Sequence, residues 1–148
     1  MIHFQWHPFS ELSVEQLYAL LKLRAEIFVV DQNCAYLDPD GKDPFALHLL
    51  GTDESGLAAY LRVFPPTEIE NYIVFGRVVT AKRARAQGFG KHMLQEFFRY
   101  CDIHYPNVTV QCSAQYYLKK FYESFGLKAY GEVYQEDNIP HIAMRKEA

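Results

Sequence analysis

A short loop that ends in Arg85-x-x-Gly88-x-Gly90 carries the most specific chemical pattern of the sequence. A largely apolar, β-branched run over residues 72–79 leads into the loop, and an amphipathic segment follows it. Three basic side chains lie around the glycines: Lys82, Arg83 and Arg85. Backbone amides at a helix N-terminus bind anions, and glycines let a ligand approach the main chain closely. The pattern therefore predicts a cradle for a phosphate or pyrophosphate group.

Two common phosphate-binding loops do not fit this spacing. A P-loop requires Gly-x-x-x-x-Gly-Lys-Ser/Thr, whereas Lys91 is followed by His92 and has no upstream glycine at the required distance. A dinucleotide-binding fingerprint requires a third glycine three residues after Gly90, where Met93 stands. The plain alternative is a strand-to-helix turn with solvated arginines.

The loop resembles the acyl-CoA loop of the GNAT N-acetyltransferase superfamily, Arg/Gln-x-x-Gly-x-Gly/Ala between a strand and a helix. A second segment, residues 113–127, is similar to that superfamily's later signature, in which a helix ends in Tyr-x-x-x-Gly-Phe/Leu and a strand follows. Here the signature reads Tyr122-Glu123-Ser124-Phe125-Gly126-Leu127. Residues 23–36 and 134–142 resemble the ElaA-type subfamily, so the likeness covers nearly the whole chain.

The resemblance implies a set of cofactor contacts made mainly by the backbone. Main-chain amides of the loop would hold the CoA pyrophosphate: Arg85, Ala86, Gln87, Gly88, Phe89 and Gly90. The backbone of Val78, Val79 and Thr80 would pair with the pantetheine arm, and one N–H there would face the thioester oxygen. Gln115 stands seven residues before Tyr122, where the family usually has an asparagine that contacts pantetheine, and glutamine keeps that amide.

Tyr122 is the candidate general acid, because a phenol near the sulfur could donate a proton to the departing thiolate. The alternative is one more aromatic side chain on the buried face of a helix, in a chain with 11 tyrosines. Acyl transfer to an amine needs no protein nucleophile, so a covalent intermediate on Cys112 is not required. The general base is left open among three residues: His48, Glu132 and His141.

Two groups of charged residues in the N-terminal half each allow two interpretations. Arg24 and Glu26 form either a buried pair that lines the acceptor cleft or ordinary surface charge on the first helix. The aspartate-rich run 38–43 is either an acidic loop that attracts a cationic amine or a solvated turn. A calcium-binding EF-hand loop is excluded, since its twelfth position is Leu49 rather than glutamate.

Composition and charge argue against several classes of partner. The net charge of −3 gives no electrostatic case for nucleic acid or for an anionic membrane surface, and no run is long enough to span a membrane. Three cysteines without a Cys-x-x-Cys pair support neither a zinc site nor a redox motif, so no metal is expected. The N-terminus lacks a secretory leader pattern, which indicates a reducing cytoplasm. A homodimer stays open, since aromatic residues are abundant.

The hydrophobic periodicity predicts a mixed α/β fold in a single domain over residues 1–148. Seven strands are expected, at 2–6, 45–50, 57–64, 72–80, 108–112, 128–134 and 141–146. Three helices are expected, at 14–28, 90–104 and 114–125. Ser13 and Ser113 are the predicted N-caps, and Gly126 is the predicted helix-ending glycine. By the resemblance, the central sheet is twisted, mostly antiparallel, splayed where two parallel strands separate, and flanked by about four helices.

Together these features predict an N-acetyltransferase that moves the acetyl group of acetyl-CoA to a primary amine by direct attack in a ternary complex. The expected acceptor is the amine of a small molecule or a peptide. Two other classes remain: a non-catalytic acyl-CoA-binding or regulatory module, and a nucleotide-binding regulator that prefers ATP. A substitution at Tyr122 distinguishes the enzyme from the binding module, because only an enzyme would lose turnover when the phenol hydroxyl is removed.

Overall fold

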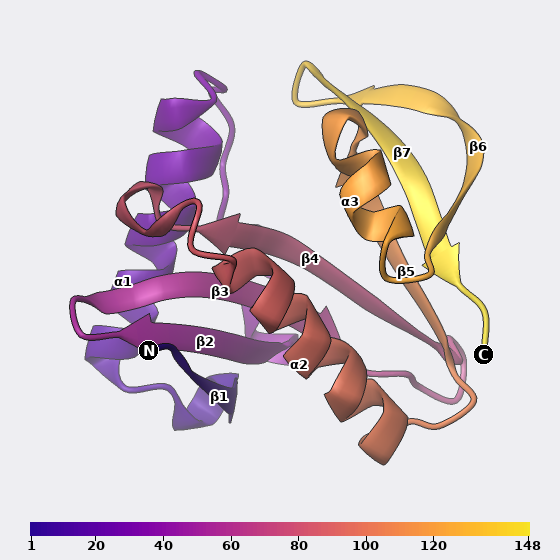
Figure 1. Ribbon diagram of the computed structural model, residues 1–148, viewed down its shortest axis with the longest axis horizontal. Coiled ribbons are helices and arrows are strands. Elements are labelled where there is room, and N and C mark those ends of the chain that lie inside the picture. The colour runs from indigo at the N-terminus through magenta and orange to yellow at the C-terminus, as the bar shows by residue number, and fades with distance from the viewer.

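One seven-stranded sheet organises the chain, and the computed structural model describes it over residues 1–148 (Figure 1). The strands are β1 His3–Pro8, β2 Leu47–Asp53, β3 Gly56–Phe64, β4 Tyr72–Thr80, β5 Thr109–Gln115, β6 Lys128–Glu136 and β7 Ile139–Lys146. They lie side by side in the order β1-β2-β3-β4-β5-β7-β6. The strands expected from the hydrophobic pattern are all present, and β4 has the predicted bounds.

The sheet divides between β4 and β5. These two strands are parallel, whereas all the other neighbours are antiparallel. They pair over only three positions, from Tyr72 opposite Thr109 to Val74 opposite Gln111. Beyond that point they diverge, as the V between them in Figure 1 shows. The predicted fold, a mostly antiparallel sheet splayed between two parallel strands, is confirmed.

Three α-helices and one π-helical segment flank the sheet; the α-helices are α1 Val14–Arg24, α2 Phe89–His104 and α3 Lys119–Glu123. Ser13 begins α1 with the predicted capping box: its hydroxyl accepts from the Gln16 amide, and Gln16 Oε1 accepts from the Ser13 amide. After Arg24 the helix widens into the π-helical segment Ala25–Asp31. The first helix thus extends past the predicted end at Phe28, and its second part has π geometry.

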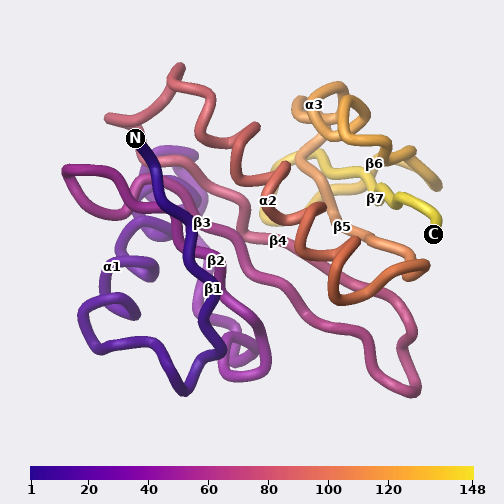
Figure 2. Tube along the Cα trace, turned by 60° about the horizontal axis from the view of Figure 1, so that its bottom comes forward, coloured from indigo at the N-terminus to yellow at the C-terminus, as the bar shows by residue number.

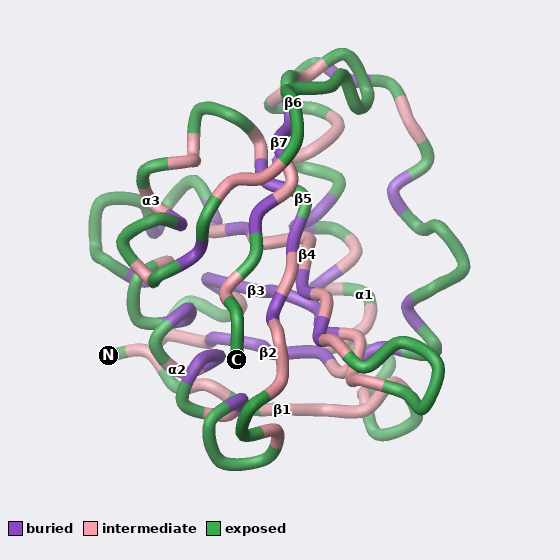
Figure 3. The backbone as a smooth tube through the Cα atoms, turned by 90° about the vertical axis from the view of Figure 1, so that its right-hand side faces the viewer, coloured by how far each residue is buried: buried purple, intermediate pink, exposed green.

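The helices cover both faces of the sheet. In Figure 1, α2 and α3 lie on the viewer's side and α1 lies behind the strands, and Figure 2 shows α1 across β2–β4 from α2. Six consecutive residues of β3, 58–63, are buried, as expected for a strand that is covered on both faces. Figure 3 shows the opposite for β6, an edge strand most of whose residues are exposed.

The N-cap predicted at Ser113 is wrong. Ser113 lies inside β5, where it pairs with Ala143 of β7 and its hydroxyl hydrogen-bonds the Tyr134 hydroxyl. A 3-10 turn, Tyr116–Leu118, separates the strand from α3. The strand continues because its alternate residues are buried and because β7 supplies a pairing partner as far as Gln115.

Gly126 ends α3 as predicted. Its φ of +92° is left-handed, and its amide donates to the Glu123 carbonyl oxygen at 2.9 Å. The Leu127 amide reaches back to the Tyr122 carbonyl oxygen at 3.4 Å. These two bonds form a Schellman motif, which satisfies the last carbonyls of the helix. The turn therefore also holds the backbone of Tyr122 in place.

A buried network of arginines and aspartates ties the loop after the π-helix to the sheet. Arg24 is fully buried at the end of α1 and donates from Nε to Asp38 at 2.7 Å and from Nη1 to Asp43 at 2.8 Å. Arg62 of β3 donates to the same Asp43 at 3.0 Å and to Asp40 at 2.7 Å. The charges of α1, β3 and the loop are thus balanced within one cluster.

Arg77 of β4 completes this network, with its Nε 2.9 Å from an Asp38 oxygen. Hydrogen bonds from the Arg62 guanidinium hold the pKa of Asp40 well below its usual range. The aspartate run is therefore neither a free acidic loop that could attract an amine nor a solvated turn, because arginines of the fold already neutralise it.

Arg24→Met should destabilise the protein by about 3–5 kcal/mol, because it leaves the three aspartates of a largely buried network with only two arginines. Arg24 does not pair with Glu26, whose carboxylate instead lies 3.8 Å from Lys22 on the exposed side of the helix. Lys22→Met is the matched control, and its solvated ion pair should contribute less than about 1 kcal/mol. Urea unfolding measures both. Equal, small losses in the two variants would contradict a supporting role for the network.

Candidate active site

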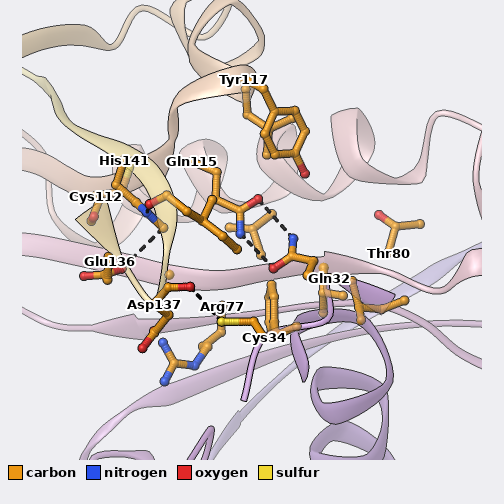
Figure 4. Close-up of a pocket in the computed structure, with 18 of the residues that line it drawn as sticks. Gln32, Cys34, Arg77, Thr80, Cys112, Gln115, Tyr117, Glu136, Asp137 and His141 are labelled. Atoms are coloured by element: carbon orange, nitrogen blue, oxygen red, sulfur yellow. Dashed lines mark hydrogen bonds and ion pairs between the residues drawn. The ribbon is translucent and has the colours of Figure 1, made fainter. Parts of the chain in front are cut away.

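A cleft with a volume of about 550 Å³ opens where β4 and β5 separate. Its walls come from the π-helix, the second half of β4, the end of β5, α3 and the hairpin between β6 and β7. Cys112 and Ser113 both line it, although neighbouring residues of a strand point to opposite faces of the sheet. The cleft therefore runs through the gap in the sheet. Figure 4 shows the polar side chains along its walls.

A β-bulge in β4 shapes one wall of the cleft. Two residues, Arg77 and Val78, stand opposite the single residue Leu61 of β3. Arg77 has a φ of +53°, a left-handed conformation that is uncommon for residues other than glycine. A bulge takes a residue out of the hydrogen-bonded ladder, so main-chain groups there are available to a ligand. The predicted pantetheine-binding residues Val78, Val79 and Thr80 line the cleft at and after this bulge.

The predicted pyrophosphate loop lies at one end of the cleft, before α2. Arg85 and Gly90 line the cleft, whereas four residues between them do not: Ala86, Gln87, Gly88 and Phe89. Gly88, with a φ of +76°, is the N-cap of α2, and no side chain caps this helix. The first amides of α2 are therefore free of side-chain partners, as a helix N-terminus that binds an anion requires.

Each of the three basic residues around the loop already has a carboxylate partner. Asp31, at the end of the π-helix, pairs with Lys82 at 3.0 Å and with Arg85 at 3.2 Å. Hydrogen bonds from these two side chains lower the pKa of Asp31. Arg83 pairs with Asp53 at 2.9 Å. Of the predicted main-chain donors, the Arg85 amide already bonds the Lys82 carbonyl oxygen at 3.3 Å, so the amides at the start of α2 are the ones left for an anion. Asp31 links the loop to the π-helix.

Tyr122, the predicted general acid, lies on α3 with 5% of its surface exposed and lines the cleft. Its ring centroid is 6.0 Å from that of Phe75 and 5.3 Å from that of Phe121. Burial raises the pKa of its phenol far above the usual value, so the hydroxyl stays protonated. No protein group forms a hydrogen bond with this hydroxyl, which leaves its proton available to a ligand.

Cys112 lies near Tyr122 on the wall of the cleft. Burial raises the pKa of its thiol to about 12, so little thiolate is present at neutral pH. Because the thiolate is the nucleophilic form of cysteine, the environment of Cys112 disfavours an acyl-cysteine intermediate.

Gln115 also lines the cleft, but its side-chain amide already forms hydrogen bonds with that of Gln32. Gln115 Nε2 donates to Gln32 Oε1 at 3.2 Å, and Gln32 Nε2 donates to Gln115 Oε1 at 3.1 Å (Figure 4). The pair joins the segment after the π-helix to the end of β5. Gln115 could contact pantetheine only if its amide gave up its hydrogen bonds with Gln32. Sequence reasoning missed Gln32, because a glutamine in a polar segment gives no signal of a partner 83 residues away.

Of the three candidate bases, only His141 lines the cleft. His48 is buried in β2, where its Nδ1 accepts from the Tyr60 hydroxyl at 2.6 Å and its Nε2 donates to the Asp43 carbonyl oxygen at 2.9 Å. Burial lowers the pKa of His48, which makes it a neutral structural residue. Glu132 is exposed on β6 and does not reach the cleft.

No cluster of three or more His, Cys, Asp or Glu side chains is arranged to hold a metal ion. The cysteines are all buried and form no disulfide: Cys34, Cys101 and Cys112. None of the helices is both long and apolar enough to cross a membrane.

Comparison with known proteins agrees with this geometry. The family described as "Acetyltransferase (GNAT) domain" matches residues 52–148. Protein ElaA of Escherichia coli (strain K12) is 42% identical over 149 residues, which cover 99% of this chain and 97% of that protein. The crystal structure of Escherichia coli ElaA superposes with a TM-score of 0.91 at 41% identity, covering 99% of this chain and 100% of that one.

A second solved structure is equally similar. It is described as an acyl-CoA N-acyltransferase from Pseudomonas aeruginosa, and it superposes with a TM-score of 0.92 at 38% identity, covering 99% of each chain. Sequence and structure thus agree along the whole length of the relatives. On these grounds the chain belongs to the GNAT acetyltransferase family and, within it, to the ElaA type.

Proposed function

We propose that the protein is an acetyl-CoA-dependent N-acetyltransferase that passes the acetyl group directly to a primary amine while both substrates are bound. One observation carries this proposal: a single cleft is lined both by the bulge of β4 and by Tyr122, whose hydroxyl has no protein partner. The GNAT fold implies acyl-CoA binding, and acetyl-CoA would supply the reactive thioester carbonyl.

The chain offers a group for each requirement of this reaction. The uncapped N-terminus of α2, with Gly88 as its N-cap, suits the pyrophosphate of CoA. Main-chain groups at the bulge of β4, next to Val78, suit the pantetheine arm and the negative charge that develops on the thioester oxygen. Tyr122 holds a proton for the departing thiolate sulfur. We propose the amine of a small molecule or a peptide as the acceptor.

Calorimetric titration with acetyl-CoA, CoA and ATP tests the proposal first. We expect micromolar binding of acetyl-CoA that exceeds ATP binding, about −8 kcal/mol at a Kd of 1 μM, because the cleft continues past the pyrophosphate loop along β4. Thiol release with a panel of primary amines then measures turnover. Binding without turnover on any amine would favour a non-catalytic acyl-CoA-binding module. A preference for ATP would favour a nucleotide-binding regulator.

Tyr122→Phe should lower kcat by about tenfold or more and leave the affinity for acetyl-CoA nearly unchanged, because only the proton donor is lost. Thiol release and calorimetry measure the two quantities. Tyr116→Phe is the matched control, since Tyr116 lies in the turn before α3 and does not line the cleft. Equal kcat values for the two variants would show that the Tyr122 hydroxyl takes no part in the mechanism.

Gln115→Ala should weaken acetyl-CoA binding by roughly two- to tenfold, the value of a hydrogen bond of about 0.5–1.5 kcal/mol. Gln32→Ala should not weaken it, because this change releases the Gln115 amide for the pantetheine arm. Calorimetry on both variants separates the two roles. Equal weakening by both would instead show that the amide pair acts as one structural unit.

A further inference from the structure

Three residues in or near the turn of the β6–β7 hairpin line the part of the cleft that the proposed acetyl-CoA contacts leave unused: Glu136, Asp137 and His141. His141 pairs directly with Gln115 across β5 and β7, so the two side chains share one face of the sheet. Cys112 and its partner Met144 point to the other face, where α3 and Tyr122 lie. Figure 4 shows Glu136, Asp137 and His141 grouped on one side of the cleft. This group therefore approaches the gap from the side opposite Tyr122.

The hydrogen bonds of His141 determine which of its nitrogens carries a proton. Its Nδ1 lies 2.7 Å from the Ile139 carbonyl oxygen, which can only accept, so Nδ1 is the donor. Nε2 is then the nitrogen that has a lone pair in the neutral ring, and it lies 3.3 Å from Oε2 of Glu136. When His141 is neutral, a lone pair of Nε2 faces this carboxylate. A cation or a proton placed between Nε2 and the carboxylate would interact favourably with both groups.

Neighbouring residues hold His141 and the hairpin turn in place. His141 is 7% exposed and stacks on Tyr134 of β6, with ring centroids 6.1 Å apart and an interplanar angle of 27°. The hairpin turn is held from the opposite wall by Cys34, whose Sγ donates to the Asp137 carbonyl oxygen at 2.7 Å. Glu136 remains half-exposed, with 51% of its side chain accessible, so the pair keeps a path to solvent.

The charges of this side of the cleft point to a cationic ligand. Neither Glu136 nor Asp137 has an ion pair with lysine or arginine, in contrast to Asp31 on the opposite wall, which pairs with Lys82 and Arg85. Two carboxylates with no fixed cation beside a buried histidine attract a small ammonium group.

We propose that Glu136, Asp137 and His141 form the acceptor site of the cleft, that they bind a primary alkylammonium group, and that His141 Nε2 takes its proton. This assignment rests on the proposed acetyl transfer. Glu136 orients the ammonium and stabilises the imidazolium that forms, while Asp137 adds negative charge at the mouth of the cleft.

The step balances in atoms and charge. The ammonium gives one proton to His141 Nε2, and the neutral amine forms a C–N bond to the acetyl carbon as the C–S bond breaks. The nitrogen loses its second proton to solvent as the amide forms, and the thiolate sulfur gains one from the Tyr122 hydroxyl. Solvent restores the tyrosine and takes the proton from His141, so one proton is released for each acetyl group transferred.

Several charged and titratable groups face this site and enter its pH dependence. Tyr134 and Glu136 approach His141 from β6, and Asp137 lies in the turn. Arg77 lines the opposite wall, where Asp38 already pairs with it. Activity should fall at acidic pH, because a proton on Nε2 prevents His141 from accepting another.

Nitrogen NMR of the ¹⁵N-histidine-labelled protein tests the site without any turnover. We expect a proton on Nδ1 of His141, and a shift of the Nε2 resonance on titration with propylammonium but not with 1-propanol. Glu136→Gln should remove this response, whereas Glu132→Gln, on the exposed part of the same strand, should keep it. An Nε2-protonated neutral ring, or no response to propylammonium, overturns the proposal.

Turnover gives the second test. His141→Gln should lower kcat with propylamine by about tenfold or more, with an unchanged KM for acetyl-CoA. The loss should be smaller with aniline, which is already uncharged at neutral pH, and the acidic limb of the pH profile should disappear. A merely structural role would lower both rates alike and keep the limb.

The NMR titration and the turnover measurement together distinguish a failure of the proposed acetyl transfer from a failure of the proposed acceptor site. A wild-type protein that binds propylammonium at His141 but transfers no acetyl group would overturn the proposed function and leave the cation site standing. A wild-type protein that acetylates propylamine, with His141→Gln and Glu136→Gln equally active, would overturn the acceptor site and leave the transferase function standing.

Discussion

Three paired positions join β4 to β5, and this short parallel contact is the constraint on which the site depends. Parallel strands that separate leave main-chain groups without a partner strand, and such groups must bind another partner or water. On its other edge β5 stays paired with β7 as far as Gln115, and on its other edge β4 carries a bulge opposite β3 at Arg77 and Val78. The main-chain groups that stay unpaired border the cleft, so ligand binding follows from the way in which the sheet divides.

Arg77 connects this division to the rest of the fold. Its left-handed φ of +53° costs roughly 1–2 kcal/mol, and its guanidinium lies 2.9 Å from Asp38. The same aspartate accepts a hydrogen bond from Arg24 at 2.7 Å, so the bulge, the loop after the π-helix and α1 share one network. Because most of this network is shielded from water, its members depend strongly on one another. The cleft wall is thus held by charge as well as by apolar packing.

The sequence could predict those features that depend on neighbouring residues. The bounds of β4, the capping box and the placement of Tyr122 on a helix beside the sheet all follow from short patterns. Ser113 shows the limit of such patterns, because pairing with β7 overrides a local N-cap signal. The remaining features depend on distant partners: Gln32 meets Gln115 across 83 residues, and Arg77 adopts a conformation for which the sequence offers no glycine. These features are determined by contacts within the assembled sheet, so no local sequence pattern predicts them.

A gap through the sheet also lets one cleft contain two different electrostatic environments. Tyr122 sits in the apolar wall beneath α3, where burial keeps its phenol protonated, and a proton donor needs that state before the thiolate forms. His141 lies on the opposite face, beside the half-exposed Glu136, where a proton can pass to water. Both side chains are buried, with 5% and 7% of their surfaces exposed, so their neighbours distinguish them: aromatic rings lie beside the phenol, and a carboxylate lies 3.3 Å from the imidazole. The divided sheet keeps these two sets of neighbours apart, because His141 faces one side of it and Cys112, which lies near Tyr122, faces the other.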